Sequence, residues 1–188
     1  MPLRNTDERW GWPSQTLHWT IAILILCMAV MGWLLGELPR TPKYFWVFDL
    51  HKSFGLLVLA LMLLRLMWRL YAGAPKPVPG TPTWQHRVAT LTHWAIYAMA
   101  FAMPISGWLY DSASGLRVLK FFGLFQVPKL SAPNPELKSL SHEIHEIGVW
   151  ILLALVLAHA GAALWHHFVQ KDRTLMRMLP ASLEKPQA

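Results

Sequence analysis

The chain has 188 residues, of which 54% are hydrophobic and only 14% are charged, whereas about 25% of residues are charged in an ordinary soluble domain. This composition excludes a disordered chain, a fibrous repeat and a water-soluble globule. The formal charge of +7 is spread between and outside the apolar segments, so we expect lipid headgroups as its partner and no nucleic acid. The single cysteine, Cys27, excludes an internal disulfide and a cysteine-based metal or iron–sulfur site.

Four apolar segments are each long enough to cross a hydrocarbon core about 30 Å thick as a helix. They cover residues 17–35, 49–71, 88–110 and 143–169, and most prolines fall in the connections between them. Only helices satisfy their own backbone groups in lipid at this length. The first segment lacks the cleavage site of a signal peptide, so we expect it to be retained. The sequence therefore predicts an all-α, integral membrane four-helix bundle, with residues 1–188 as a single membrane domain.

One proline lies inside a predicted span. Pro104 is part of the string Met103-Pro104-Ile105-Ser106-Gly107 in the third segment. A proline inside a helix leaves a backbone carbonyl without its donor. We therefore expect a kink there, unless neighbouring helices or Ser106 satisfy that carbonyl.

The distribution of basic residues predicts the orientation in the membrane. An even number of spans places both termini on one side, together with the connection between the second and third spans. Ten of the 17 Lys and Arg residues, including Lys185 and seven of the nine arginines, lie on this terminal side. The other side carries the remaining seven basic residues: Arg40, Lys43, Lys52, Arg117, Lys120, Lys129 and Lys138. Because cytoplasmic loops carry the excess of basic residues, we expect both termini in the cytoplasm.

Nine histidines carry most of the functional information, because ionisable groups inside a membrane are costly and usually functional. His145 and His159 are 14 residues apart in the fourth span, which corresponds to about 21 Å of rise and about 1400° of rotation. They therefore share one helix face at two membrane levels. Two imidazoles so far apart cannot bind one metal ion, so if both histidines are ligands there are two metal centres, one near each membrane surface.

Topology supplies a partner for each of these histidines. His18 begins the first span at the level of His159, and His51 begins the second span at the level of His145. Pairs of histidines that face each other across apolar helices suit two b-type haems, whose iron takes one nitrogen from each side. Gly55, four residues after His51, is expected to leave room for the macrocycle. Zinc would require more ligands at each level.

Other histidines compete for these positions. His93 lies on the cytoplasmic side of the third span and is an alternative to His18, and helix spacing alone leaves that choice open. His142 is an alternative to His145, but it is offset by about 100° from the face of His159. His166 and His167 lie about two turns beyond His159. They are interpreted as interfacial residues or as groups that line a site next to the inner haem.

The residues resemble the bacterial cytochrome b561 family, the four-helix, di-haem type that includes superoxide oxidase. The similarity covers approximately residues 9–180, and the string 162–169, Ala-Ala-Leu-Trp-His-His-Phe-Val, is the most specific part of it. The other matching strings are Arg9-Trp10, Leu17-His18-Trp19, Leu50-His51-Lys52-Ser53-Phe54-Gly55, His145-Glu146 with His159, and Lys171-Asp172-Arg173 with Met176-Arg177-Met178-Leu179-Pro180.

The resemblance implies that His18, His51, His145 and His159 bind the iron of two b haems, and it makes His93 the less favoured ligand. It also implies a location in the inner membrane of a bacterial cell. The expected activity is electron transfer from a periplasmic donor to ubiquinone, which would bind near His166. In superoxide oxidases the donor is superoxide. Relatives in the wider group serve instead as cytochrome b anchors and electron relays for a dehydrogenase or hydrogenase partner. A bundle without a cofactor, in which the histidines only pack, would make little use of the two matched levels.

Lys52 is the candidate residue for steering an anionic donor, because it adjoins His51 in the sequence. A cation close to a haem edge can focus superoxide into productive encounters. The outer side carries seven basic and six acidic residues, a net charge of only +1. The overall charge should therefore attract an anionic donor only weakly, and the local arrangement of charges must decide where the donor approaches. The alternative interpretation is that Lys52 anchors lipid headgroups or pairs with a haem propionate.

Overall fold

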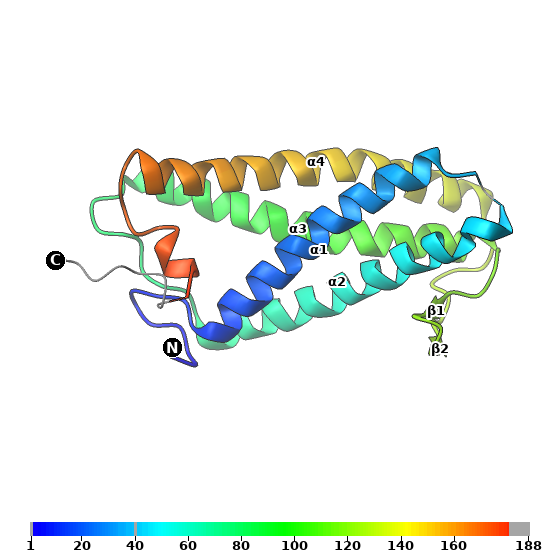
Figure 1. Ribbon diagram of the computed structural model, residues 1–188, viewed down its shortest axis with the longest axis horizontal. Coiled ribbons are helices and arrows are strands. Elements are labelled where there is room, and N and C mark those ends of the chain that lie inside the picture. Colours follow the sequence, from blue (N-terminus) through cyan, green and yellow to red (C-terminus); the bar gives the residue numbers. More distant parts are fainter. Residues whose placement is uncertain (1, 40, 181–188) are drawn as a thin grey trace. The chain divides into compact units, whose positions relative to one another are not determined.

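The computed structural model describes residues 2–39 and 41–180. Arg40 and Lys185, both counted in the comparison of basic residues, lie outside the described residues. The described residues form four long helices and one small hairpin (Figure 1). The elements in chain order are α1 (Trp12–Glu37), η1 (Pro42–Tyr44), α2 (Phe45–Ala72), α3 (Thr83–Ser114), β1 (Lys120–Phe121), β2 (Phe125–Gln126), α4 (Pro135–Phe168) and η2 (Met176–Met178).

All four helices are long and apolar enough to cross a membrane. They contain 26, 28, 32 and 34 residues, and about 20 residues suffice for the hydrocarbon core. The prediction of an all-α membrane protein with four spans is confirmed. Many large apolar side chains along the helices are exposed, for example Trp33, Leu91 and Trp150, as expected for surfaces that lipid covers in place of water.

The helices extend beyond the apolar segments because polar groups close their ends. The side chain of Asn134 accepts hydrogen bonds from the amides of Glu136 and Leu137, each at 3.0 Å. This cap starts α4 at Pro135, well before the apolar segment at residue 143. Pro104 lies inside α3, which continues through it to Ser114, and the Ser106 hydroxyl donates to the Met103 carbonyl at 2.9 Å.

The chain divides into two compact units, and each helix contributes residues to both. Unit 1 contains residues 1–20, 63–96 and 153–188, and unit 2 contains residues 21–62 and 97–152. In unit 2 three serines are among the most deeply buried side chains, one on each of α2, α3 and α4: Ser53, Ser112 and Ser141. Such small side chains allow helix backbones to approach one another closely.

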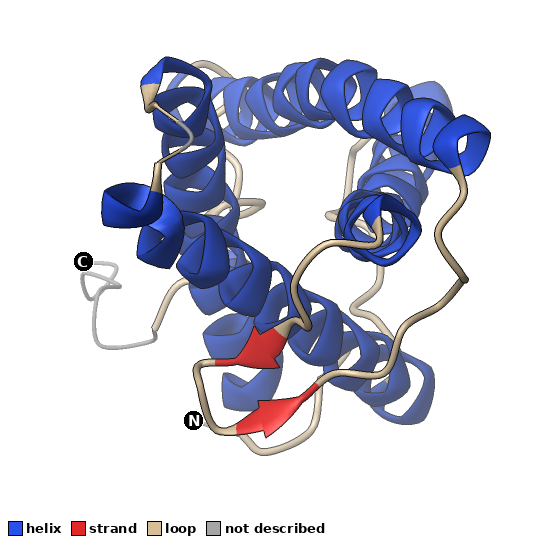
Figure 2. Ribbon diagram, turned by 90° about the vertical axis from the view of Figure 1, so that its right-hand side faces the viewer, coloured by secondary structure: helices blue, strands red, loops and turns tan. Residues whose placement is uncertain are grey.

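Unit 2 also carries the hairpin between α3 and α4. Strands β1 and β2 are antiparallel, with Phe121 paired to Phe125. Figure 2 shows the two strands beside α2. The Ser53 hydroxyl on α2 accepts the amide of Phe122 at 3.0 Å and lies 3.3 Å from the Lys120 carbonyl. The turn of the hairpin is therefore fixed to α2.

Arginines organise the chain ends in unit 1. The Arg9 guanidinium donates to the Met176 and Leu179 carbonyls at 3.2 and 2.6 Å. Arg177 in turn donates to the carbonyls of Asp7 and Lys76 at 2.7 and 2.8 Å. These bonds connect the segment before α1, the connection between α2 and α3, and the segment after α4.

Candidate functional site

A histidine of α2 lies opposite a histidine of α4 in unit 2. The ring centroids of His51 and His145 are 6.3 Å apart, with 72° between the ring planes. Because a metal–imidazole bond is about 2.0 Å long, two rings that bind one iron atom from opposite sides have centroids about 6 Å apart. The spacing of the two rings fits a pair of axial ligands.

Backbone and hydroxyl groups of α3 hold the ring of His145. Its Nδ1 lies 3.0 Å from the carbonyl oxygen of Met103 and 3.0 Å from the Ser106 hydroxyl oxygen. A carbonyl only accepts hydrogen bonds, so Nδ1 carries the proton and donates. The lone pair is then on Nε2, the nitrogen available to a metal.

Two glycines make room for the rings. A Cβ atom on Gly107 would lie 3.2 Å from Cε1 of His145, and one on Gly32 would lie 3.4 Å from Cε1 of His51. Sequence reasoning selected Gly55, where a Cβ atom would instead lie 3.8 Å from the terminal methyl group of Met28. It missed Gly32 and Gly107, although Gly107 belongs to the string around Pro104 that the sequence did single out.

The two rings of this pair are supported unequally. Nδ1 of His51 is buried and has no hydrogen-bond partner among the described residues, whereas Nδ1 of His145 has two. A buried polar atom without a partner carries a free-energy cost unless another group satisfies it. His145 is therefore the ring that the protein fixes, and His51 is the less restrained ring.

Three histidines lie close together in unit 1. The ring centroids of His18 on α1 and His159 on α4 are 6.1 Å apart, with 80° between the planes. The ring centroid of His93 on α3 lies 5.1 Å from that of His159, too close for two ligands on opposite sides of one iron, which require about 6 Å. The spacing therefore favours His18 over His93 as the partner of His159.

His142 has other contacts than those of a ligand pair. Its ring lies 5.1 Å from that of Tyr110, and its Nδ1 lies 3.4 Å from a Glu146 carboxylate oxygen. The ring that lies opposite His51 belongs to His145. The angular offset of about 100° along the helix accounts for this division between the two histidines.

His166 forms a polar pair in unit 1 that the sequence did not predict. Its Nδ1 lies 2.5 Å from a carboxylate oxygen of Asp172, and both side chains are largely buried. Burial acts to raise the pKa of Asp172, but hydrogen bonds from Thr174 and His166 outweigh it, so the pKa lies below its ordinary value. The carboxylate therefore stays ionised near neutral pH and orients the imidazole.

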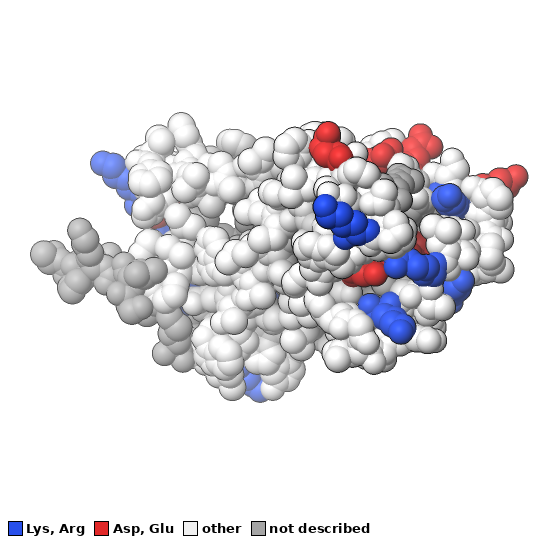
Figure 3. All heavy atoms as spheres, turned by 45° about the vertical axis from the view of Figure 1, so that its right-hand side comes forward, with Lys and Arg blue, Asp and Glu red and all other residues white. Residues whose placement is uncertain are grey.

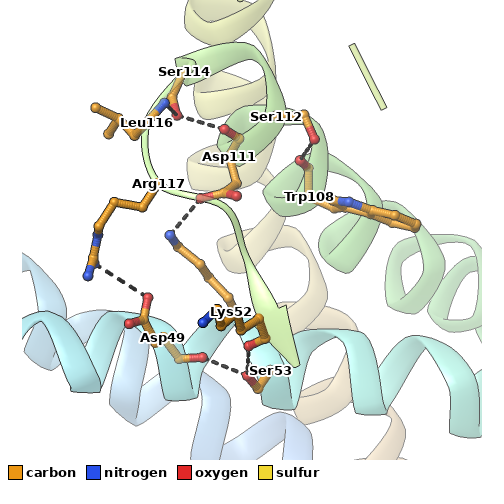
Figure 4. Close-up of polar contacts among 10 residues, drawn as sticks. Asp49, Lys52, Ser53, Trp108, Asp111, Ser112, Ser114, Leu116 and Arg117 are labelled. Carbon is orange, nitrogen blue, oxygen red and sulfur yellow. Dashed lines mark hydrogen bonds and ion pairs between the residues drawn. The ribbon is translucent and has the colours of Figure 1, made fainter. Parts of the chain in front are cut away.

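Lys52 forms an ion pair with Asp111 at the end of α3 (Figure 4). The ammonium and carboxylate are 2.5 Å apart, and the exposed fractions of the side chains are 28% and 9%. Sequence reasoning missed this partner because no local pattern connects residues so far apart. In the same cluster Arg117 lies 3.5 Å from Asp49, and Figure 3 shows basic and acidic side chains intermixed on this part of unit 2.

The donor set fits haem better than a free metal ion. Among residues 2–39 and 41–180, no three His, Cys, Asp or Glu side chains are placed to hold a metal ion together. Two imidazoles satisfy haem iron, because the porphyrin supplies the other four nitrogens. The buried, unpartnered Nδ1 of His51 agrees with a group that the chain itself does not provide.

The chain is similar to three named bacterial proteins. The chain is 34% identical over 183 residues to cytochrome b561 homolog 2 of Escherichia coli strain K12, and the match covers 97% of each chain. It is 37% identical over 169 residues to cytochrome b561 homolog 1 of the same strain, with 87% of this chain and 93% of the relative covered. It is 32% identical over 168 residues to the probable superoxide oxidase CybB of Yersinia pestis, with 87% and 92% covered.

A sequence model of one family, described as prokaryotic cytochrome b561, matches residues 9–181. That range includes all four helices and every histidine described above. Membership implies a b haem and electron transfer in the membrane. The chain belongs to the prokaryotic cytochrome b561 family.

Proposed function

We propose that the chain binds two b haems, one between His51 and His145 and the other between His18 and His159. The observation that carries this proposal is the matched spacing of the two pairs, with ring centroids 6.3 and 6.1 Å apart. Haem held by two imidazoles exchanges single electrons and has no open position on the iron. The chain would therefore transfer electrons without binding a small molecule at the metal.

The proposed reaction takes electrons from superoxide and gives them to ubiquinone. Two superoxide anions, one ubiquinone and two protons yield two dioxygen molecules and one ubiquinol. Superoxide supplies one electron at a time, whereas ubiquinone needs two. Two haems can hold the two electrons until both pass to ubiquinone. The similarity to a probable superoxide oxidase supports this donor.

The side chains of the protein have two roles in the proposed reaction: they orient the haem ligands and they deliver protons to ubiquinone. Met103 and Ser106 orient His145, and Gly32 and Gly107 leave space beside the rings. The two protons that ubiquinone needs must arrive near its binding site. His166, oriented by Asp172, is the group that we assign to deliver a proton there.

Both termini are proposed to lie in the cytoplasm of a bacterial cell. The excess of arginines on the terminal side supports this orientation. A reporter protein that is active only in the cytoplasm should be active when it is fused after the last residue. Activity of a reporter that requires the periplasm would overturn the orientation.

The proposed function is tested by measuring haem content and haem reduction in the purified protein. Pyridine haemochrome analysis should give two b haems per chain, and rapid mixing with superoxide should reduce them. Addition of ubiquinone should then reoxidise them. One haem or none per chain would contradict the two sites. Haems that dithionite reduces but superoxide does not would favour the alternative role as an electron relay for a partner protein.

The ion pair makes Asp111 the sharper test of steering by Lys52. Asp111 neutralises the ammonium of Lys52, and Lys52→Glu would place two carboxylates together. Asp111→Asn should free the positive charge. If Lys52 steers superoxide, Asp111→Asn should speed haem reduction by up to about tenfold at low salt and steepen its dependence on ionic strength.

The matched control carries Lys52→Gln with Asp111→Asn, which removes both charges. Its rate and its salt dependence should return to those of the original protein. Stopped-flow absorption measures all three proteins. An Asp111→Asn rate that stays unchanged across ionic strengths would contradict steering by Lys52.

Asp172→Asn should slow haem reoxidation by ubiquinone but leave reduction by the donor unchanged. The loss should reach up to about 100-fold, the lower end of the range for a positioned proton-transfer group. Because the pKa of Asp172 is lowered in the folded protein, its ionised, hydrogen-bonded form is fully present above about pH 4 and is lost as the pH falls through the lowered value. The effect of Asp172→Asn should therefore persist across neutral pH and disappear in acid.

Asp7→Asn provides the control for this experiment. Asp7 also forms an ion pair in unit 1, with Lys76, but both side chains are exposed. Its replacement should leave reoxidation unchanged, because an exposed pair contributes little. Equal rates for Asp172→Asn and the original protein would remove His166 and Asp172 from the proposed proton delivery.

A further inference from the structure

The hairpin of unit 2 carries an apolar tip that its own fold does not cover. Leu124 is 78% exposed and Phe125 is 58% exposed, and Phe122 between the strands is also exposed. Leu116 and Val118, just before β1, are exposed as well. A cluster of exposed apolar side chains on a loop indicates a surface that contacts something else.

The hairpin is held in place by contacts that do not involve Leu124. Leu119 and Val127 at its base are buried, and the Val127 amide donates to the Leu119 carbonyl at 2.9 Å. The turn is held as well, although Phe122 has a φ of 46°, in the left-handed region that disfavours bulky side chains. The hydrogen bond to Ser53 and the ring contact with Phe54 offset that strain.

The attachment to α2 sets the depth of the hairpin. Ser53 lies eight residues after the start of α2, about 12 Å along the helix. The 28 residues of α2 span about 42 Å and exceed the hydrocarbon core by about 12 Å, or about 6 Å at each end. Ser53 therefore lies about 6 Å inside the boundary of the hydrocarbon core, within reach of the membrane interface. Figure 1 agrees, because the hairpin projects to the side of α2 and not beyond its end.

The charges of the connection match an anionic surface. Residues 115–134 contain Arg117, Lys120 and Lys129 but no Asp or Glu. Lys120 and Lys129 are exposed. Apolar side chains flanked by cations are typical of segments that lie in the interface of a membrane with anionic lipids.

We propose that the hairpin lies in the membrane interface, with the side chains of Leu124 and Phe125 among the lipid acyl chains and Lys120 and Lys129 at anionic headgroups. The occupant of this surface is the lipid bilayer itself. Because Ser53 follows His51 by two residues on α2, the hairpin would tie the helix turn that carries His51 to the membrane surface.

A single fluorescent label tests this placement in the haem-loaded protein. Cys27 is the one native cysteine and is exposed, so it is first replaced by Ser. An environment-sensitive dye is then attached at Leu124→Cys, and the matched control carries it at Glu136→Cys, an exposed position in the first turn of α4. The proteins are placed in vesicles of phosphatidylcholine, with or without phosphatidylglycerol. An unchanged haem spectrum verifies the fold.

The label at residue 124 should show blue-shifted emission and should be quenched by brominated lipids more than by iodide. The label at residue 136 should show the reverse pattern. Equal iodide quenching at the two positions would overturn the proposal and would point to a surface for a soluble partner protein.

Changing the charges tests the headgroup contact. Lys120→Glu with Lys129→Glu should shift the emission from residue 124 towards that of a water-exposed dye. The shift should be larger in vesicles that contain phosphatidylglycerol than in phosphatidylcholine alone. An identical response in both vesicles would contradict the role of anionic headgroups.

Discussion

Replacing His159 with alanine is expected to reduce the haem content from two b haems per chain to one. The same loss is expected for His18→Ala, because the two rings form the pair whose centroids are 6.1 Å apart. Each substitution removes one of the two imidazoles proposed to bind the iron, and the surrounding apolar side chains offer no other ligand. Pyridine haemochrome analysis measures the content, and redox titration identifies which haem remains.

His93→Ala is the matched control, because His93 also lies close to His159 but at 5.1 Å between ring centroids. It should retain both haems. If His93→Ala loses a haem while His18→Ala keeps two, then His93 is the partner of His159. The proposal for unit 2 would be unaffected by that result, because it depends on different residues.

The two ligands proposed in unit 2 should respond differently when each is removed. His51→Gly should keep its haem on His145, and added imidazole should restore the six-coordinate absorption spectrum. His145→Gly should bind that haem about 10- to 100-fold more weakly than His51→Gly does. A factor of this size is the usual cost of losing the hydrogen bonds that orient a metal ligand. The reason is that Met103 and Ser106 hold only the ring of His145. Haem titration of the two apoproteins measures the difference.

Serine variants in the His51→Gly background show whether the hydrogen bonds cause this asymmetry. Ser106→Ala should weaken haem retention further. Ser141→Ala should not, because Ser141 is also buried but bonds only to carbonyls of its own helix. Equal haem affinity of His51→Gly and His145→Gly would show that the ring contacts of α3 do not decide which ligand is fixed.

The sequence by itself determined the four membrane helices, and it predicted two levels of histidines. Both follow from features that are local along the chain. An apolar segment of sufficient length becomes a helix in lipid because no other structure satisfies its backbone. The shared face of His145 and His159 follows from the helical repeat alone. The assignment of both termini to the cytoplasm also rests on the sequence alone and remains a prediction.

The tertiary structure decided which side chains meet between helices. Spacing could not choose between His18 and His93, and no pattern joined Lys52 to Asp111 or identified Gly32 and Gly107 as the glycines beside the rings. The hairpin between α3 and α4 was also missed, because its strands are only two residues long. Contacts between helices depend on how each helix is rotated and shifted against its neighbours. The repeat of a single helix fixes neither quantity, so these pairings emerge only when the helices pack.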